Sequence, residues 1–461
     1  MYGGRTMRRN TKQAGVASIL ALVLLTVFCT IAIGLVASND SAMKQSDNAR
    51  RVLDARLAAE SGLEFMLRTL KWVRLPGTTT EQTFGENLRE VLAGALEGAN
   101  GLSAGSIVST SSSVFVPEIE STAGGFCSTF TRVSDTCVRL RVEGRSGDLT
   151  RNVRIDLTLE PKLPVVFDFG IASRGQVRVF GNANIVGVNY PQEASVLSAT
   201  TSHLDALYAE GNSNISGDLY TAEEGTYITI SGGPTVAGCT TLEEIEQHVH
   251  EGIGQPDFPE YDVAPLASLA TYTLQPSDPT NKGELSNVRI PAGANPTFSS
   301  DIILNGVVYI EAPNDVKFTA KCTLNGLVVT EESEEPLSAC QLRFEGGVVA
   351  NGVEALPDTA EFAAVKQETG TFVLAPGFGV TFAGHFSAIN GSIAADQLTF
   401  TGTAEGTVKG SVIGLADTLT SVGGNVDIYV DRENADDDPA GFIKSLAFVP
   451  APDTYEEVLP Q

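Results

Sequence analysis

The hydrophobic pattern begins with one long apolar run. Residues 16–37 read VASILALVLLTVFCTIAIGLVA, 22 positions without a charge or a proline. As a helix rising about 1.5 Å per residue, the run is about 33 Å long, enough to cross a hydrocarbon core of roughly 30 Å. A buried core helix rarely needs so long an uncharged run, so the pattern predicts a transmembrane helix over 16–37.

Helical periodicity continues beyond this run. No proline follows until Pro76, and the stretch is rich in Ala, Leu, Arg, Glu and Met. Apolar residues recur at spacings of three and four, interrupted by Arg56: Ala49, Val52, Ala59, Leu63, Met66 and Leu70. We therefore predict one unbroken helix to about Val73, within a segment 16–75, whose second half packs on the following domain.

Residues 76–164 predict a small α+β unit. Residues 86–97 (ENLREVLAGALE) favour a short helix. Apolar and polar positions then alternate in four segments bounded by turn residues: 106–116, 126–133, 137–145 and 150–160. Such alternation is typical of an antiparallel meander.

From residue 165 a repeated motif replaces the simple alternation. Its copies are VRVFGNANIVG (177–187), ITISGGPTVAG (228–238), VKFTAKCTLNG (316–326) and, with one or two extra residues, VTFAGHFSAING (380–391) and LTFTGTAEGTVKG (398–410). Short strands separated by Gly and Asn turns indicate a β-solenoid over 165–450, in particular a right-handed parallel β-helix. A β-sandwich is the alternative.

Two segments break this pattern. Residues 240–300 are Pro-rich and poorly periodic, which predicts a loop insertion lying against the solenoid. Residues 451–461 are rich in Pro and acidic residues, which predicts a disordered tail.

Charge is distributed unevenly around the apolar run. Residues 1–75 hold 11 Lys and Arg against 5 Asp and Glu, a net charge of +6, whereas the remaining 386 residues hold 19 against 51, a net charge of −32. The basic leader predicts a cytoplasmic N-terminus, a single pass through the inner membrane, and an exterior remainder. The acidic exterior argues against nucleic acid as a partner.

Whether the apolar run stays as an anchor is a separate question. Secretory signal peptides have apolar regions of about 7–15 residues that end in a small-x-small site. Val36-Ala37-Ser38 resembles such a site, although the run before it is longer. Ordinary secretion is therefore an alternative to anchoring.

Three motifs together resemble the type IV pilin-like proteins. Gly15-Val16 opens the apolar helix, AAESGL follows at 58–63, and Glu143-Gly144-Arg145 precedes a strand beginning RNVRI. The resemblance covers about residues 5–160. Within this family, the segment is most similar to minor-pilin assembly proteins that carry an AAE(S/A)GL signature. The resemblance implies a leader 1–15, cut after Gly15 by a prepilin peptidase that methylates Val16. It also implies pilin-like subunits and inner-membrane lipids as partners.

The chain departs from major pilins at Leu20. Major pilins have Glu as the fifth residue of the mature chain, where it neutralises the terminal amine of a neighbouring subunit, because an uncompensated charge in hydrocarbon is costly. Leu20 resembles instead the minor pilins and the tip-type pseudopilin of type II secretion. Segments such as LNGVVYI (304–310) also resemble the solenoid domain behind some pilin-like N-termini.

The cysteines offer two candidate disulfides. Cys127 and Cys137 flank a short polar loop, and Cys322 and Cys340 are more widely spaced. Outside the cytoplasm either pair is a candidate for a disulfide, and free buried thiols are the alternative. Cys239 then has no partner, and no pair has the Cys-x-x-Cys spacing of zinc or redox sites.

Candidate chemistry is sparse. His248 and His250 lie two apart among glutamates, a weak candidate for a transition metal. Asp436, Asp437 and Asp438 form a carboxylate run that is weakly suggestive of Ca²⁺. His385 has no acidic partner beside it in sequence, and there is neither a phosphate loop nor a nucleophile elbow. We therefore expect no cofactor and no enzymatic activity.

These features predict a non-enzymatic pilin-like component of a type IV pilus or type II secretion-type filament. The expected position is minor or at the tip, with the solenoid displayed at the cell surface for adhesion, including to surface glycans, or for capping. One alternative is a membrane-anchored carbohydrate-binding or carbohydrate-active β-helix protein. Another is a single-pass envelope structural protein.

Overall fold

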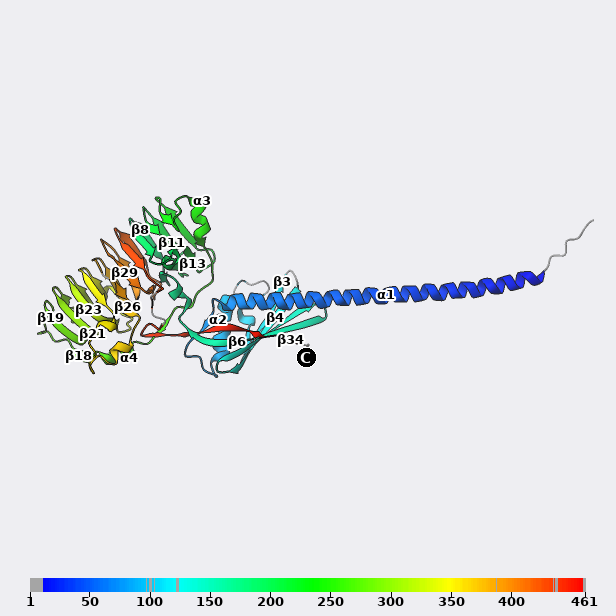
Figure 1. Cartoon of the computed structure of the whole chain (residues 1–461), viewed down its shortest axis with the longest axis horizontal. Coiled ribbons are helices and arrows are strands. Elements are labelled where there is room, and N and C mark those ends of the chain that lie inside the picture. The colour runs from blue at the N-terminus through cyan, green and yellow to red at the C-terminus, as the bar shows by residue number, and fades with distance from the viewer. Residues whose placement is uncertain are drawn as a thin grey trace, which may run out of the picture.

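The computed structural model describes residues 11–458, apart from residues 97, 99–101, 103, 122–123, 387, 434 and 436–437. Residues 1–10 of the predicted leader, Asp436 and Asp437 lie outside the described residues. The described chain has a long helix, an antiparallel sheet and a stack of parallel strands. Figure 1 shows the free part of the helix and the strand stack at opposite ends of the molecule, with the sheet between them.

The long helix is α1 (Thr11–Leu70), 60 residues without a break. At about 1.5 Å per residue it is roughly 90 Å long. The predicted continuation of the apolar helix is thus confirmed, although α1 ends at Leu70 rather than at Val73. Its last turns pack on the sheet, so the second half of the helix is held by tertiary contacts and the first half is uncovered (Figure 1).

Seven strands form the antiparallel sheet, in the order β1-β34-β6-β5-β4-β3-β2. Their bounds are β1 (Arg74–Leu75), β2 (Val108–Ser109), β3 (Ser113–Ser121), β4 (Gly124–Ser134), β5 (Cys137–Ser146), β6 (Leu149–Lys162) and β34 (Ser445–Val458). The predicted meander is confirmed by β3 to β6. Apolar residues of α1, of the sheet and of α2 (Phe84–Ala95) share one core.

The predicted disordered tail is wrong for the residues that the structure describes. Residues 451–458 continue β34, which pairs with β6 from Ser445 opposite Lys162 to Val458 opposite Asn152. The register breaks between Ala451 and Glu456, around Pro452, because proline cannot donate to a strand ladder. Proline and acidic residues hid a strand whose partner lies about 300 positions earlier.

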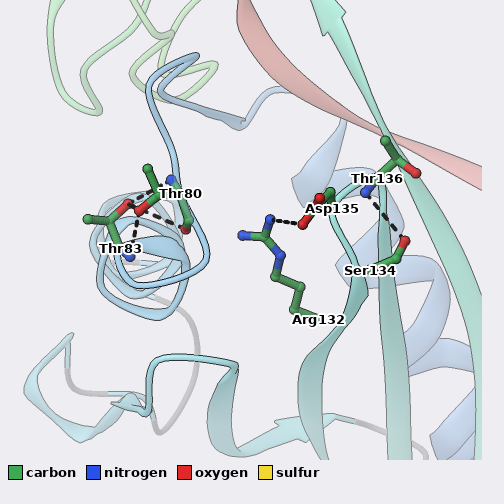
Figure 2. Close-up of polar contacts among 6 residues, drawn as sticks. All are labelled: Thr80, Thr83, Arg132, Ser134, Asp135 and Thr136. Atoms are coloured by element: carbon green, nitrogen blue, oxygen red, sulfur yellow. Dashed lines mark hydrogen bonds and ion pairs between the residues drawn. The ribbon is translucent and has the colours of Figure 1, made fainter.

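The start of α2 is fixed by a local hydroxyl network. The backbone N–H of Thr80 donates to Oγ1 of Thr83 at 2.9 Å, just before the helix begins (Figure 2). Arg132 projects from β4 and pairs with Asp135 at 2.9 Å (Figure 2). Its guanidinium also lies 5.7 Å from the ring centre of Phe84. These contacts attach the first residue of α2 to the end of β4.

Residues 171–430 form a second unit, which we call the coil stack. One turn of the chain comprises β7 (Ile171–Ser173), β8 (Val177–Gly181) and β9 (Asn184–Gly187). On one side these strands pair in parallel with β10 (Val196–Ser198), β11 (Asp205–Glu210) and β12 (Asn214–Ile215). On the other side they pair in parallel with β30 (Val412–Gly414), β31 (Thr420–Gly424) and β32 (Asp427–Val430). Neighbouring coils therefore pair in parallel, whereas the strands of the alternative, an antiparallel β-sandwich, pair antiparallel.

The chain enters the coil stack at its middle. It runs first to one end through β13 (Leu219–Thr221), β14 (Tyr227–Ser231), β15 (Thr235–Val236) and β16 (Val249–His250). The short helix α3 (Leu242–Ile245) lies just before β16. After β16 the chain crosses to the other end through a segment that contains β17 (Glu260–Tyr261) and α4 (Ala264–Leu269). There β18 (Tyr272–Thr273) pairs with β19 (Gly283–Ile290).

From β19 the coils return to the middle. Their strands are β20 (Thr297–Phe298), β21 (Ile302–Ile310), β22 (Asn314–Phe318), β23 (Cys322–Thr330), β24 (Cys340–Phe344), β25 (Val348–Asn351), β26 (Thr371–Phe382), β27 (Ile389–Asn390), β28 (Ser392–Phe400) and β29 (Glu405–Lys409). In Figure 1 the teal and green early coils therefore adjoin the orange late ones. After β32, the short β33 (Phe442–Ile443) pairs with β17, and β34 rejoins the sheet.

The predicted insertion 240–300 is partly wrong. Of that range, β16, β18, β19 and β20 all pair within the coil stack. Val288, Ile290 and Phe298 are fully buried in its core. Proline and glycine at the turns obscured these strands, so only the crossover between β16 and β18 lies outside the coils.

Two side-chain ladders run along the stack. Five phenylalanines stack with ring centres 4.8 to 5.1 Å apart: Phe298, Phe318, Phe344, Phe382 and Phe400. Nearby, the amide of Asn325 donates to Asn305 at 2.7 Å and that of Asn351 donates to Asn325 at 2.8 Å. Each rung repeats the same residue because successive coils place equivalent positions in register.

Candidate functional site

The uncovered half of α1 is the largest exposed apolar surface of the described residues. Ile19, Phe28 and Val36 expose 67%, 63% and 69% of their surface. The hydroxyls of Thr26 and Thr30 donate to the carbonyls of Val23 and Val27, both at 2.8 Å. Both hydroxyl groups therefore have a hydrogen-bond partner within the helix and do not depend on water for one. In the described part of the chain, α1 is the one helix long and apolar enough to span a membrane.

A charged middle segment links the apolar half of α1 to the sheet. Four ion pairs at i, i+4 spacing lie along it: Lys44–Asp40, Arg51–Asp47, Arg50–Asp54 and Arg56–Glu60. All are exposed, so each contributes only about 0.3–0.5 kcal/mol. Together they support the helix between its apolar half and the residues from Ala55 onward that pack on the sheet.

Small residues seat α1 on the sheet. Ala55, Ala58 and Ala59 are fully buried. A Cβ on Gly144 of β5 would lie 2.2 Å from the backbone N of Ala59 and 2.3 Å from the carbonyl O of Ala55. Gly144 thus permits direct contact between strand and helix backbones. The predicted stripe is correct from Ala59 onward, but Ala49 is exposed and Val52 is half-buried.

The AAESGL motif has two distinct faces at this seat. Gly62 faces the sheet, where an added Cβ would lie 2.5 Å from the ring of Phe126. Glu60 faces outward and accepts from Arg56 at 2.9 Å and from the hydroxyl of Tyr455 at 3.5 Å. The Glu60 bond raises the pKa of Arg56. The motif thus combines close packing with a tie to β34.

The structure places the predicted processing residues only in part. Gly15 and Val16 lie within the backbone of α1, and most of the leader before them is outside the described residues. Leu20 is 63% exposed, on the uncovered half of the helix. Cleavage after Gly15 and methylation of Val16 stay predictions.

Neither candidate disulfide forms in the structure, where all six cysteines are free thiols. Cys137 lies opposite Ser134, which is seven residues beyond Cys127 on β4. That separation is about 23 Å, whereas a disulfide requires Cα atoms within about 7 Å. Cys127 and Cys137 are close in sequence but lie at different heights of the β4–β5 hairpin, because its strands extend well beyond the turn.

The second cysteine pair fails for a similar reason. Cys340 lies opposite Asn314, at the start of β22, whereas Cys322 follows the other end of that strand. The length of β22 therefore separates them, roughly 13 Å. Burial raises the pKa of Cys322 to about 12, so this thiol is an inert core residue.

The two histidines of the weak metal prediction do meet at one carboxylate. Nδ1 of His248 lies 2.8 Å from Oδ1 of Asp218, and Nε2 of His250 lies 3.6 Å from Oδ2. The ring of His250 also stacks on Tyr220 with centres 4.6 Å apart. No group of three or more His, Cys, Asp or Glu with metal-binding geometry occurs among the described residues.

Asp438 and His385, two further candidates from the sequence, each have a charged neighbour in the structure. Asp438, the described member of the carboxylate run, pairs with Lys444 at 3.2 Å. His385 does have an acidic neighbour, because Glu405 on the next coil lies 3.1 Å from its Nδ1. Sequence proximity could not show this partner, since it lies 20 residues away. Both side chains are exposed, and neither borders a cavity described here.

Glu193 is a buried acidic residue of the coil stack that no pattern in the sequence indicated. Its side chain is fully buried and accepts from the backbone N–H groups of Asn189, Arg432 and Glu433 at 2.8 to 3.0 Å. The Asn189 amide donates a further bond at 3.0 Å. Burial alone would raise the pKa of Glu193, but these hydrogen bonds outweigh it and hold the pKa below its ordinary value. The carboxylate fastens the point where the chain leaves the coil stack.

Comparison with known proteins finds a likeness to solved structures but none to known sequences. No protein-family profile matches the chain, and no curated protein matches its sequence. The crystal structure of the competence-associated pilin ComZ from Thermus thermophilus aligns with 89% of this chain and 98% of that chain. Identity is 14% and the TM-score is 0.26. At this TM-score the likeness does not establish a shared fold.

Proposed function

We propose that this chain is a non-enzymatic pilin-like subunit, assembled through α1 and displaying the coil stack outside the cell. One observation carries the proposal. The uncovered apolar half of α1 continues without a break into a half seated by Ala55, Ala59 and Gly62 on an antiparallel sheet. A helix needed only as an anchor has no reason to continue as the central packing element of a folded domain.

The proposed sequence of events starts in the inner membrane. A prepilin peptidase cuts after Gly15 and methylates Val16, and the apolar half of α1 then joins a helical bundle with other pilin-like subunits. Lipid tails are as apolar as the side chains of this helix, so transfer gives little hydrophobic driving force. Close helix packing, and work supplied by an assembly machinery, must provide the rest.

Leu20 supports a minor or tip position. A subunit in the middle of a filament needs a carboxylate near this position to pair with the amine of its neighbour. Leu20 provides none, and its side chain is exposed on the helix. We therefore propose a minor or tip position in a type IV pilus or type II secretion-type filament.

The head function that we propose is adhesion or capping. We interpret the coil stack as a right-handed β-solenoid, with surface glycans as a candidate target. We propose no catalytic residue in the coil stack. Glycan-array binding without release of reducing sugar is the expected result for the full chain. Release abolished by replacing His385 or Glu405 would show an enzyme instead.

N-terminal processing tests the proposal directly. Mass spectrometry of chain recovered from cells with a prepilin peptidase should show the loss of residues 1–15 and the gain of one methyl group. Gly15→Leu should block this change. Gly34→Leu is the matched control, because an added Cβ at Gly34 meets nothing within 4 Å.

An intact leader would overturn the proposal and favour a single-pass envelope protein. A chain that begins near Ser38 would indicate ordinary secretion. Processing that survives Gly15→Leu would show that a different peptidase acts.

A further inference from the structure

A cavity of about 470 Å³ lies where the coil stack meets the antiparallel sheet. Its volume falls within the range of ligand pockets, roughly 300–1,000 Å³. Four cationic side chains line it: Arg74, Lys162, Arg432 and Lys444. Asp168 is the one acidic residue among its described lining residues. Both units contribute, so the cavity exists only in the folded whole.

This concentration of positive charge contrasts with the rest of the molecule. From residue 165 onward the chain has 11 Lys and Arg against 40 Asp and Glu. Two of those 11 cations, Arg432 and Lys444, line the cavity, and Arg74 and Lys162 join them from the sheet side. An anion that reaches this cavity therefore meets four converging positive charges on a molecule that is otherwise strongly acidic beyond residue 165.

The cations keep the capacity to bind a ligand. Arg432 pairs with Asp168 at 3.5 Å, Lys444 with Asp438 at 3.2 Å and Lys162 with Glu160 at 3.5 Å. Those carboxylates are 73%, 70% and 45% exposed, so each pair is weak and readily exchanged. Arg432 also donates to the backbone carbonyl of Asp168, and Nη1 of Arg74 donates to the carbonyls of Lys71 and Val73 at 3.1 Å. Among the described residues, Nε of Arg74 is buried and has no hydrogen-bond partner, so it is the group with unused binding capacity.

The other walls define what kind of anion fits. Pro161, Leu163 and Phe167 provide apolar surface beside the cations. Ser392 and Ser411 lie at the cavity, where the Ser411 hydroxyl donates to the carbonyl of Phe167 at 3.0 Å. A wall of this mixed character suits a compact ligand with an anionic group and a less polar body.

We propose that this cavity is a binding site for a compact organic anion, carrying a carboxylate or a phosphate, held jointly by the sheet and the coil stack. Arg74 and Lys162 would bind from the sheet side, and Arg432 and Lys444 from the two ends of the segment that leaves the stack. The site is independent of whether the leader is processed. A bound anion would link the two units through opposite charges.

Isothermal titration of the full chain in detergent tests the site with three probes at millimolar concentrations: glucuronate, inorganic phosphate and neutral glucose. We expect glucuronate, phosphate or both to bind and glucose not to bind, with affinity falling as salt rises. Glucuronate alone would identify a carboxylate site with a sugar-sized body. Phosphate alone would identify a phosphate site.

The double variant Lys162→Gln with Lys444→Gln should weaken binding at least tenfold. The control double variant Lys282→Gln with Lys321→Gln removes the same charge from exposed positions outside the cavity lining, and should bind as the original chain does. Thermal melts of both variants show that each is folded. Unchanged affinity in the first variant, equal binding of glucose, or no binding of either anion would overturn the proposal.

Discussion

Gly144→Ala is expected to unseat α1 from the sheet. The backbone of Gly144 does not have a positive φ, so alanine fits the strand conformation and its effect is steric alone. The new Cβ would lie 2.2 Å from the backbone N of Ala59, where an ordinary contact needs at least 3.4 Å. Backbone atoms cannot rotate away, so the helix must shift by about 1 Å or more along its buried face.

The cost can be bracketed from similar perturbations. Overpacking a well-packed core costs about 1–3 kcal/mol when side chains can adjust, and the rigid helix backbone places Gly144→Ala at or above the upper end. Gly62→Ala is milder, because the atom it meets belongs to the Phe126 ring and alanine favours the helix by about 1 kcal/mol. Gly94→Ala in α2 meets nothing within 4 Å and should be neutral or stabilising.

The single tryptophan provides the assay. Trp72 lies just beyond α1 and is 36% exposed, so its fluorescence reports on the seating of the helix. Urea titration of the full chain in a nonionic detergent, followed by this signal, should rank unfolding free energies in the order Gly94→Ala, Gly62→Ala, Gly144→Ala from highest to lowest. Far-UV circular dichroism of the full chain, recorded in the same titration, serves as the comparison, because it reports on all secondary structure rather than on the helix seat alone.

Equal midpoints for Gly144→Ala and Gly94→Ala would refute the steric argument. So would a large loss in Gly94→Ala, since that substitution removes no contact. A loss seen only in the circular dichroism, with the Trp72 transition unchanged, would show that Gly144 acts outside the helix seat.

Three further predictions concern the rest of the chain. Phe344→Ala removes the central rung of the phenylalanine ladder and should cost the coil stack about 3–5 kcal/mol in urea denaturation, whereas an unchanged midpoint would mean that the neighbouring rings refill the space. Glu193→Gln should cost roughly 1.5–3 kcal/mol at neutral pH. Because the folded pKa of Glu193 is depressed, its stabilisation is complete above the ordinary pKa and is lost as pH falls through the folded pKa, so the variant should show a flatter stability-pH profile below about pH 5; a parallel profile would contradict this. Dithiothreitol should leave the melting temperature unchanged, because Cys127 and Cys137, like Cys322 and Cys340, are too far apart to bond; a fall in melting temperature would indicate an oxidised pair.

Local periodicity explains what the sequence predicted well. The unbroken helix, the strands of the meander and the five repeats all depend on spacings of two to four residues, which a short window contains. Each repeat coincides with two strands around one turn, such as β8 and β9 at 177–187.

Long-range pairing explains what the sequence could not predict. β34 pairs with β6 about 300 residues away, and its prolines resemble those of a disordered tail. The middle of the coil stack pairs β7 with β30, which no local pattern predicts. Glu193 follows a proline in a turn-like segment, so its sequence signal is that of an exposed acid, and only the folded chain brings Arg432 to it.

The attachment of the coil stack at its middle has a mechanical consequence. In the proposed filament, tension between a surface bound by the stack and α1 passes through β6 and β34 together, because the chain enters the stack after β6 and leaves it before β34. Inside the stack that load reaches the coils 171–187 and 412–430 first, and three parallel pairings clamp these to each other. Coils nearer either end lie off the line of force. Pulling therefore strains the centre of the head while leaving its outer faces undeformed for contact.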